Sequence, residues 1–130
     1  MATWDLSKTS HHVLICNGGS CTRKEADEVT LAIRNEIAAW GADDSIHTTR
    51  TRCNGRCEDA CVVTVYPQGV WYKSITPDLG RRIVREHLLQ GHVLEEHLVY
   101  TYDKVFVATG LGAAGTTREE AARKKQDNAV

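Results

Sequence analysis

At 130 residues, the chain is long enough for one domain with a modest core and too short for two. Its 16 basic and 17 acidic residues leave a net charge of −1, which gives no overall field that would attract nucleic acid or an anionic membrane. The first residues lack the apolar stretch of a secretory signal, and nowhere do 18 consecutive apolar residues occur. We therefore expect a cytoplasmic protein that binds neither nucleic acid nor a membrane.

The first predicted elements are a strand and a helix. An apolar run at 11–17 stops at a Gly-Gly pair and predicts a buried strand. From about 24 to 40, apolar residues recur every three or four positions, which predicts a helix that ends at Gly41. The predicted inward stripe of this helix consists of Val29, Ile33, Ile37 and Trp40.

Three strands and a second helix are predicted next. Residues 45–51 are rich in β-formers and alternate in polarity, and the apolar runs 61–67 and 69–75 are separated by a Gln-Gly turn. Thr76 is a suitable N-cap and is followed by proline, so a helix is predicted from there to Gly91. The predicted order is β-α-β-β-β-α, an α/β domain in which every cysteine lies on a loop or at a strand edge.

The remaining segments flank this domain. We expect 1–10 to be an N-terminal lead, 11–91 to be the domain, 92–111 to be an extension with room for a strand, and 112–130 to be a flexible tail with at most a frayed helix. The string GLGAAG at 110–115 formally satisfies the glycine pattern of a dinucleotide site. Only fifteen residues follow it and it lies outside any βαβ unit, so we interpret it as part of the tail.

Five cysteines carry the strongest functional signal. The cytoplasm is reducing and five is an odd number, so a disulfide framework is disfavoured and metal binding or thiol redox chemistry is expected. Two of the cysteines stand in ICNGGSC and three in RCNGRCEDAC, and their positions are Cys16, Cys21, Cys53, Cys57 and Cys61. Four thiolates from two loops would form an all-sulfur site, which suits zinc or an iron-sulfur cluster.

The cysteine spacing favours an iron-sulfur cluster over zinc. Structural zinc sites generally use tight C-x2-C pairs, whereas this chain has C-x4-C at Cys16 and Cys21 and C-x3-C at Cys53 and Cys57. A [2Fe-2S] cluster is larger and binds two thiolates on each iron, so two looser loops can hold it from opposite sides. A structural zinc module stays open, as does a thiol redox protein that uses Cys57 and Cys61, although the chain has no C-x-x-C.

The chain also resembles the thioredoxin-like [2Fe-2S] ferredoxins. The resemblance runs from about Val13 to Gly91 and rests on ICNGGSC, CNGRC, VVTVYPQGVWY and TPDLGRRIVREHLLQG. It implies a thioredoxin-like fold and a one-electron carrier rather than an enzyme. It also implies that the [2Fe-2S] cluster is bound by the four thiolates at the family's ligand positions, which are Cys16, Cys21, Cys53 and Cys57.

The resemblance implies narrower properties as well. The C-x4-C spacing is similar to that of the small [2Fe-2S] subunit of respiratory NADH dehydrogenase, and NGGSCTRK is similar to members linked to cobalamin biosynthesis. The implied partners are redox proteins. A homodimer is also implied, with Trp71, Tyr72 and the segment after Gly91 supplying apolar contact.

Two further features lie beside the second cysteine pair. Cys61 departs from the family pattern, and we interpret it as a small buried residue in preference to a spare ligand or a site of oxidation. Arg50, Arg52 and Arg56 either offset the charge of a cluster and attract an acidic partner, or form a solvated strand edge.

Overall fold

A mixed sheet organises the protein, whose computed structural model describes residues 2–128 and the side chains as far as residue 125. Within this described part, six strands lie in the order β2-β1-β3-β4-β5-β6. The pair β1 and β2 is parallel, and each other pair of neighbours is antiparallel. Met1, Ala129 and Val130, which belong to the predicted lead and tail, lie outside the described residues.

The order of the elements confirms the predicted β-α-β-β-β-α domain. The strands are His11–Cys16 (β1), Ile46–Thr51 (β2), Val63–Tyr66 (β3), Val70–Tyr72 (β4), Leu98–Tyr102 (β5) and Phe106–Ala108 (β6). The helices are Gly19–Arg23 (α1), Ala26–Ala39 (α2), Pro77–Arg82 (α3) and Arg118–Asn128 (α4). Three shorter helical stretches are Cys57–Asp59 (η1), Ile83–Leu88 (η2), which continues α3, and Glu95–His97 (η3). Thr76 caps α3 as predicted, because its hydroxyl accepts a hydrogen bond from the amide of Leu79 at 3.2 Å.

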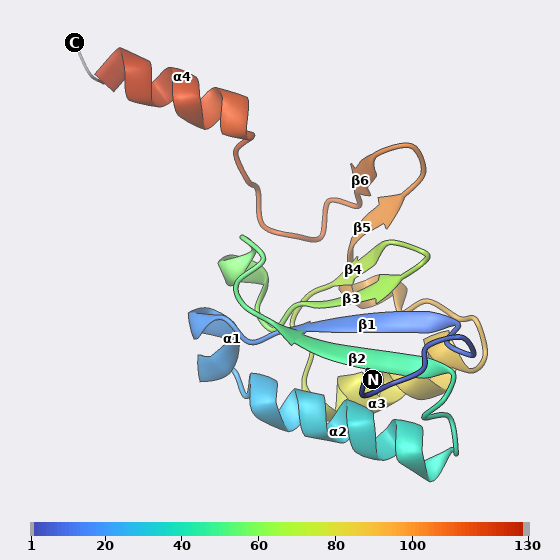
Figure 1. Ribbon diagram of the computed structural model, residues 1–130. Coiled ribbons are helices and arrows are strands. Elements are labelled where there is room, and N and C mark those ends of the chain that lie inside the picture. The colour runs from blue at the N-terminus through green and yellow to red at the C-terminus, as the bar shows by residue number, and fades with distance from the viewer. Residues whose placement is uncertain (1, 129–130) are drawn as a thin grey trace.

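The core lies between the sheet and two helices on one of its faces (Figure 1). α2 packs against α3 and also contacts β1 and β2. Val13 and Ile15 of β1 lie opposite Val65 and Val63 of β3, and all four side chains are fully buried. Burying such a side chain stabilises the fold by roughly 1.5–3 kcal/mol. This face of the central strands therefore anchors the strand ends from which the cysteine loops depart.

The expectation that every cysteine lies on a loop or at a strand edge is wrong for two of them. Cys21 lies within α1, and Cys57 is the first residue of η1. α1 is a single turn whose first hydrogen bond runs from the amide of Thr22 to the carbonyl of Gly18 at 2.8 Å. One turn is too short to show an apolar period, so the sequence pattern contained no signal for it.

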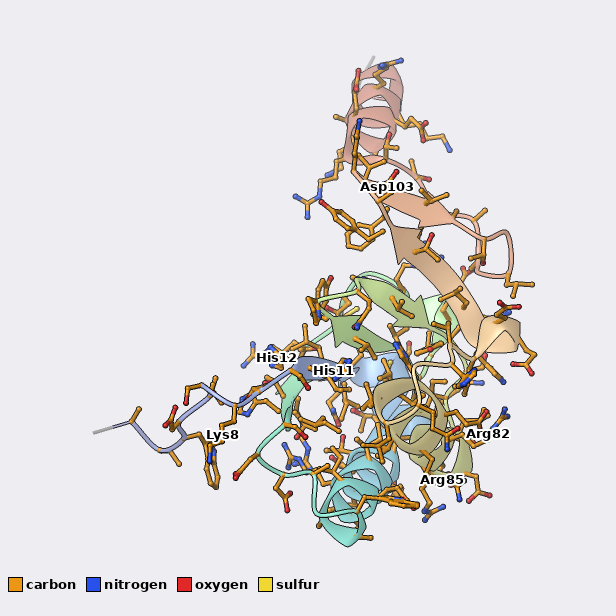
Figure 2. All side chains as sticks on the ribbon, turned by 90° about the vertical axis from the view of Figure 1, so that its right-hand side faces the viewer. Lys8, His11, His12, Arg82, Arg85 and Asp103 are labelled. Carbon is orange, nitrogen blue, oxygen red and sulfur yellow. The ribbon has the colours of Figure 1, made fainter. Side chains whose placement is uncertain are left out.

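The segments after Gly91 form regular structure. β5 pairs with β4 and β6 pairs with β5, so 92–111 continues the sheet of the domain. Asp103 lies in the turn of this β5–β6 hairpin, at the opposite end of the molecule from Arg85 (Figure 2). α4 projects away from the sheet (Figure 1), and its sequence REEAARKKQDN offers no apolar stripe for packing. The boundaries predicted for lead, domain, extension and tail stay a prediction.

A buried polar pair joins the sheet to the helical stretch η2. The hydroxyl of Tyr72 lies 2.8 Å from Nδ1 of His87 and accepts a hydrogen bond from the amide of Leu94 at 3.2 Å. Both rings are buried, and the ring of His11, labelled at the start of β1 in Figure 2, lies 6.4 Å from that of His87. Burial, with a smaller contribution from His11, lowers the pKa of His87 to about 4.

We expect this histidine to make folding stability fall as the pH drops from about 6.5 to about 4. In that window the unfolded chain binds a proton on His87 that the folded chain does not bind, so acid favours unfolding. The measurement is the thermal midpoint of the native chain and of His87→Gln between pH 7 and pH 4. The variant should lose less stability than the native chain, whereas His92→Gln, at an exposed histidine, should follow the native curve. Parallel curves for the native chain and His87→Gln would contradict the prediction.

Candidate metal centre

Two loops meet at one end of the sheet because two parallel strands end there together. β1 ends at Cys16, which lies opposite Thr51 at the end of β2. The amide of Asn17 donates to the carbonyl of Thr51 at 2.8 Å and ties the two exits to each other. Cys53 follows the end of β2 by two residues, so the register of the strands brings the end of β1 at Cys16 close to the loop that carries Cys53. Figure 1 shows α1 and the chain that leaves β2 at this same end.

These loops enclose a small cavity lined by four of the five cysteines. The residues that line it are Cys16, Gly18, Ser20, Cys21, Cys53, Arg56 and Cys57. The structure therefore brings together the four cysteines that the resemblance implies as ligands. Ser20 also lines the cavity and was not predicted, because serine beside a turn carries no signal that distinguishes it from an ordinary loop residue.

Gly18 permits the close approach of the two loops. A Cβ atom at this position would lie 2.8 Å from both Cα and Cβ of Cys53 and 2.9 Å from its amide nitrogen. Such distances are shorter than any normal contact between carbon atoms, and most of these atoms belong to the backbone, which cannot move aside by a change of rotamer. Glycine is therefore required at position 18, because the gap between the loops is too narrow for a Cβ atom.

The two cysteine pairs differ in their environment. Cys16 and Cys21 are buried, whereas Cys53 and Cys57 are exposed. Burial raises the pKa of the Cys21 thiol to about 12. The amide of Gly55 donates to Sγ of Cys53 at 3.3 Å and is the main reason that the pKa of Cys53 is lowered. The cavity thus has a buried wall of thiols and an exposed wall on which the sulfur of Cys53 accepts a backbone hydrogen bond.

The two sulfur atoms of the exposed pair, Cys53 and Cys57, also lie close enough together to bind the same metal atom. Sγ of Cys53 and Sγ of Cys57 lie 3.3 Å apart. Within residues 2–128, no group of three His, Cys, Asp or Glu side chains has an arrangement suited to a single metal ion. The four thiols therefore share a cavity without converging on one central point.

Cys61 lies outside this cavity. Its side chain is buried, and its thiol donates to the carbonyl of Cys21 at 3.2 Å and to the carbonyl of Lys24 at 3.1 Å. The interpretation of Cys61 as a small buried residue is confirmed. Its contacts also show a role that the sequence did not indicate, since the thiol binds the carbonyls at both ends of the turn from Cys21 to Lys24, where α1 ends.

The three arginines around the second pair do not act as one basic patch. Arg56 forms an ion pair with Asp59 at 2.6 Å, and Arg50 lies 3.8 Å from Asp27. Arg52 is exposed beside Cys53. Two of the three charges are therefore balanced by acidic neighbours, which weakens the prediction of a surface that attracts acidic partners.

No helix in the described part of the chain is both long and apolar enough to cross a membrane.

Comparison with known proteins places this site in a family. The sequence pattern of the thioredoxin-like [2Fe-2S] ferredoxins matches residues 5–87. A proposed 2Fe-2S ferredoxin of Priestia megaterium is 56% identical over 104 residues, which cover 80% of this chain and 81% of the relative. A 2Fe-2S ferredoxin of Clostridium pasteurianum is 31% identical over 93 residues, which cover 65% of this chain and 91% of the relative.

Solved structures agree with the sequence comparison. The structure of a thioredoxin-like [2Fe-2S] ferredoxin from Aquifex aeolicus superimposes with a TM-score of 0.69 at 29% identity. The match covers 73% of this chain and 94% of the Aquifex protein. The predicted thioredoxin-like α/β fold is thereby confirmed, and the chain belongs to the thioredoxin-like [2Fe-2S] ferredoxin family.

Proposed function

We propose that this ferredoxin binds its [2Fe-2S] cluster through Cys16, Cys21, Cys53 and Cys57 and uses it to carry single electrons. The observation that carries the proposal is the single cavity that these four thiols line. The set contains only sulfur donors, which are the ligands that iron-sulfur clusters prefer. The donors come in two pairs from opposite sides, as a cluster with two thiolates on each iron requires.

The same arrangement weighs against the two alternatives. Structural zinc sites generally use tight C-x2-C pairs, whereas the pairs that line this cavity are spaced C-x4-C and C-x3-C. A redox pair of Cys57 and Cys61 would need two thiols that face each other. Cys57 is exposed at the cavity, whereas the thiol of Cys61 is buried and donates to two backbone carbonyls.

The protein's contribution to electron transfer is a rigid and partly exposed site. The cluster, when bound, supplies a centre that gains or loses one electron without making or breaking covalent bonds. The strand ends hold Cys16 and the start of the second loop in a fixed register, which limits rearrangement when the charge changes. Cys53 and Cys57 face solvent, so they form the side that a redox partner can approach. We expect a potential near the plant-type value of about −400 mV or moderately above it.

We further propose that the partners are redox proteins that dock at this exposed pair and that the chain works in the cytoplasm without catalysing bond chemistry of its own.

We also propose a homodimer, but its contact surface differs from the one predicted from the sequence. Tyr72 is fully buried within the chain, so it cannot contribute. Trp71 is partly exposed and lies 6.2 Å from the ring of Tyr100 and 5.7 Å from that of Phe106, and these three rings offer apolar contact. The similarities to the NADH dehydrogenase subunit and to cobalamin biosynthesis stay predictions.

A redox titration under anaerobic conditions tests the carrier function. The visible absorption of the purified protein should bleach on reduction and return on oxidation along a one-electron curve, with the iron content unchanged after several cycles. A two-electron curve that tracks the number of free thiols, or loss of iron in the first cycle, would contradict an electron carrier.

A further inference from the structure

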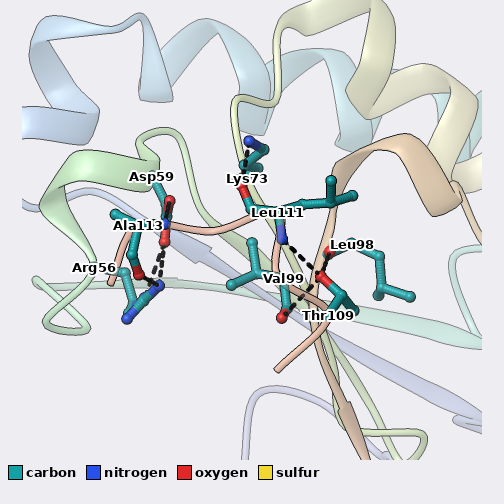
Figure 3. A network of polar contacts seen from close by, with 8 residues as sticks. All are labelled: Arg56, Asp59, Lys73, Leu98, Val99, Thr109, Leu111 and Ala113. Carbon is teal, nitrogen blue, oxygen red and sulfur yellow. Dashed lines mark hydrogen bonds and ion pairs between the residues drawn. The ribbon is translucent and has the colours of Figure 1, made fainter. Parts of the chain in front are cut away.

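Residues 109–115, here the C-terminal arm, lead from β6 towards α4 and pass beside the loop of the second cysteine pair (Figure 3). The arm binds this loop through the backbone of Ala113. Nη2 of Arg56 donates to the carbonyl of Ala113 at 2.6 Å, and the amide of Ala113 donates to Oδ1 of Asp59 at 2.8 Å. One arm residue therefore binds both members of the Arg56–Asp59 ion pair.

The start of the arm is tied to the sheet. The amide of Thr109 donates to the carbonyl of Val99 at 3.0 Å, and its hydroxyl donates to the carbonyl of Leu98. Nζ of Lys73 donates to the carbonyl of Leu111 at 2.5 Å. The arm is thus held by β5 and by the end of β4 before it reaches the cysteine loop, as Figure 3 shows.

The ion pair beneath the arm is buried. The side chains of Arg56 and Asp59 are 14% and 4% exposed, and the guanidinium also lies 5.1 Å from the centre of the Tyr100 ring. Taking two charges out of water is costly unless the remaining donors and acceptors are satisfied. Oδ2 of Asp59 accepts from Arg56 and Oδ1 accepts from the arm, so the arm completes the hydrogen bonding of the carboxylate.

The pair is directly connected to the cluster ligands. Arg56 precedes Cys57 in the chain, and it is one of the residues that line the cavity of the four cysteines. The amide of Asp59 donates to the carbonyl of Arg56 at 2.9 Å and closes the turn that begins at Cys57. The position of the exposed cysteine loop therefore depends on where the Arg56 side chain is held.

Gly112 allows the arm to lie this close. A Cβ atom there would be 2.5 Å from Cγ1 of Val99 and 3.0 Å from Nη2 of Arg56. A side chain at this position therefore requires the arm or the side chains of Val99 and Arg56 to move. The glycines of GLGAAG thus include one that is required for close packing of the arm.

We propose that Arg56 and Asp59 are positioning residues through which the C-terminal arm fixes the loop of Cys53 and Cys57 in the place where it binds the cluster. The inference rests on the proposed function, because it takes Cys53 and Cys57 as ligands. It assigns 109–115 a role in the site itself, although these residues follow the second cysteine pair by more than fifty positions.

Two substitutions in the full chain test this role. Asp59→Asn keeps the shape of the side chain and removes the charge that pairs with Arg56. Gly112→Val displaces the arm without touching the cysteine loop in sequence. The matched controls are Glu119→Gln, which breaks the ion pair of Glu119 with Arg123 on the exposed helix α4, and Thr116→Val, which adds the same valine just after the arm.

The first readout is hydrogen exchange of the metal-free proteins. Amides of 53–59 should exchange about tenfold faster in Asp59→Asn and Gly112→Val, because the loop opens more readily, while amides of β1 and β3 keep their native rates. Both controls should match the native chain throughout. Native exchange of 53–59 in Asp59→Asn would overturn the proposal, and this variant keeps the test decisive if Gly112→Val does not fold.

The second readout uses the proteins after loading with iron and sulfide. A chelator should remove the cluster at least about fivefold faster from the two variants, and their visible circular dichroism should differ from the native spectrum, since the loop that orients two thiolates has moved. A native spectrum and a native rate of loss in both variants would overturn the role in positioning. If the native chain itself takes up no cluster, the proposed function fails, while the exchange comparison still decides whether the arm holds the loop.

Discussion

Cys53→Ser and Cys16→Ser should each lower the iron bound per chain at least about tenfold after reconstitution, whereas Cys61→Ser should leave it near the native level. Cys16 at the end of β1 and Cys53 in the later loop each supply one sulfur to the cavity, and an alcohol is a poor ligand for iron-sulfur clusters. In Cys61→Ser, the new hydroxyl group keeps a donor for the carbonyls of Cys21 and Lys24, to which the thiol now donates. The measurement is iron and sulfide per chain, with the visible spectrum.

The control in this experiment is the fifth cysteine. Every variant replaces one sulfur by one oxygen, so Cys61→Ser accounts for the effect of the exchange itself on folding. Loss of the cluster in Cys61→Ser together with its retention in Cys57→Ser would overturn the assignment of the ligands and require a cavity that includes Cys61.

The second large effect is expected from a single methyl group at the glycine between the loops. Gly18→Ala places a Cβ atom 2.8 Å from Cα of Cys53, so one loop has to retreat from the other. Overpacking of this kind costs about 1–3 kcal/mol of stability, and here it also separates the two halves of the cavity. We expect a lower denaturant midpoint and a cluster content that falls with it.

Gly19→Ala is the matched control for this change. Its added methyl group would lie 3.6 Å from the end of the Arg23 side chain, an ordinary contact, and alanine favours the helical turn α1 that begins there. The native iron content should be kept in Gly19→Ala. Equal iron content in both variants would show that the approach of the loops does not depend on Gly18.

The central elements of the fold were predictable because their apolar side chains recur at regular intervals along the sequence. The apolar period of α2 correctly placed Val29, Ile33 and Ile37 in the core. Trp40 was assigned to the same stripe, yet it is 59% exposed, because it is the C-cap, where the chain leaves the helix. The apolar period describes residues inside a helix, so it does not predict whether the residue at which the helix ends is buried.

The residues that form the site could be predicted from the sequence, but their geometry could not. The number and spacing of the cysteines indicated sulfur ligation, and the same four cysteines line the cavity. The burial of Cys21 within a helical turn and the backbone contacts of Cys61 depend on packing between α1 and the later loop. Neither leaves a repeating pattern in the sequence.

The C-terminal arm shows the limit of sequence patterns most clearly. The string GLGAAG was assigned to the tail because only fifteen residues follow it and it lies outside any βαβ unit. Ala113 nevertheless contacts Arg56 and Asp59, which are 57 and 54 positions earlier in the chain. Its contacts use backbone atoms, which every residue possesses, so these contacts could not be predicted from the identity of the side chains.

Metal and sulfide analysis of anaerobically purified protein, joined to EPR after reduction with dithionite, tests the assignment of the cavity to a [2Fe-2S] cluster most directly. Four thiols shared between two irons predict brown protein with equal amounts of iron and sulfide, little zinc, and a spin-half signal in the reduced state. Colourless protein that takes up no iron and sulfide on reconstitution and instead contains one zinc per chain would contradict it.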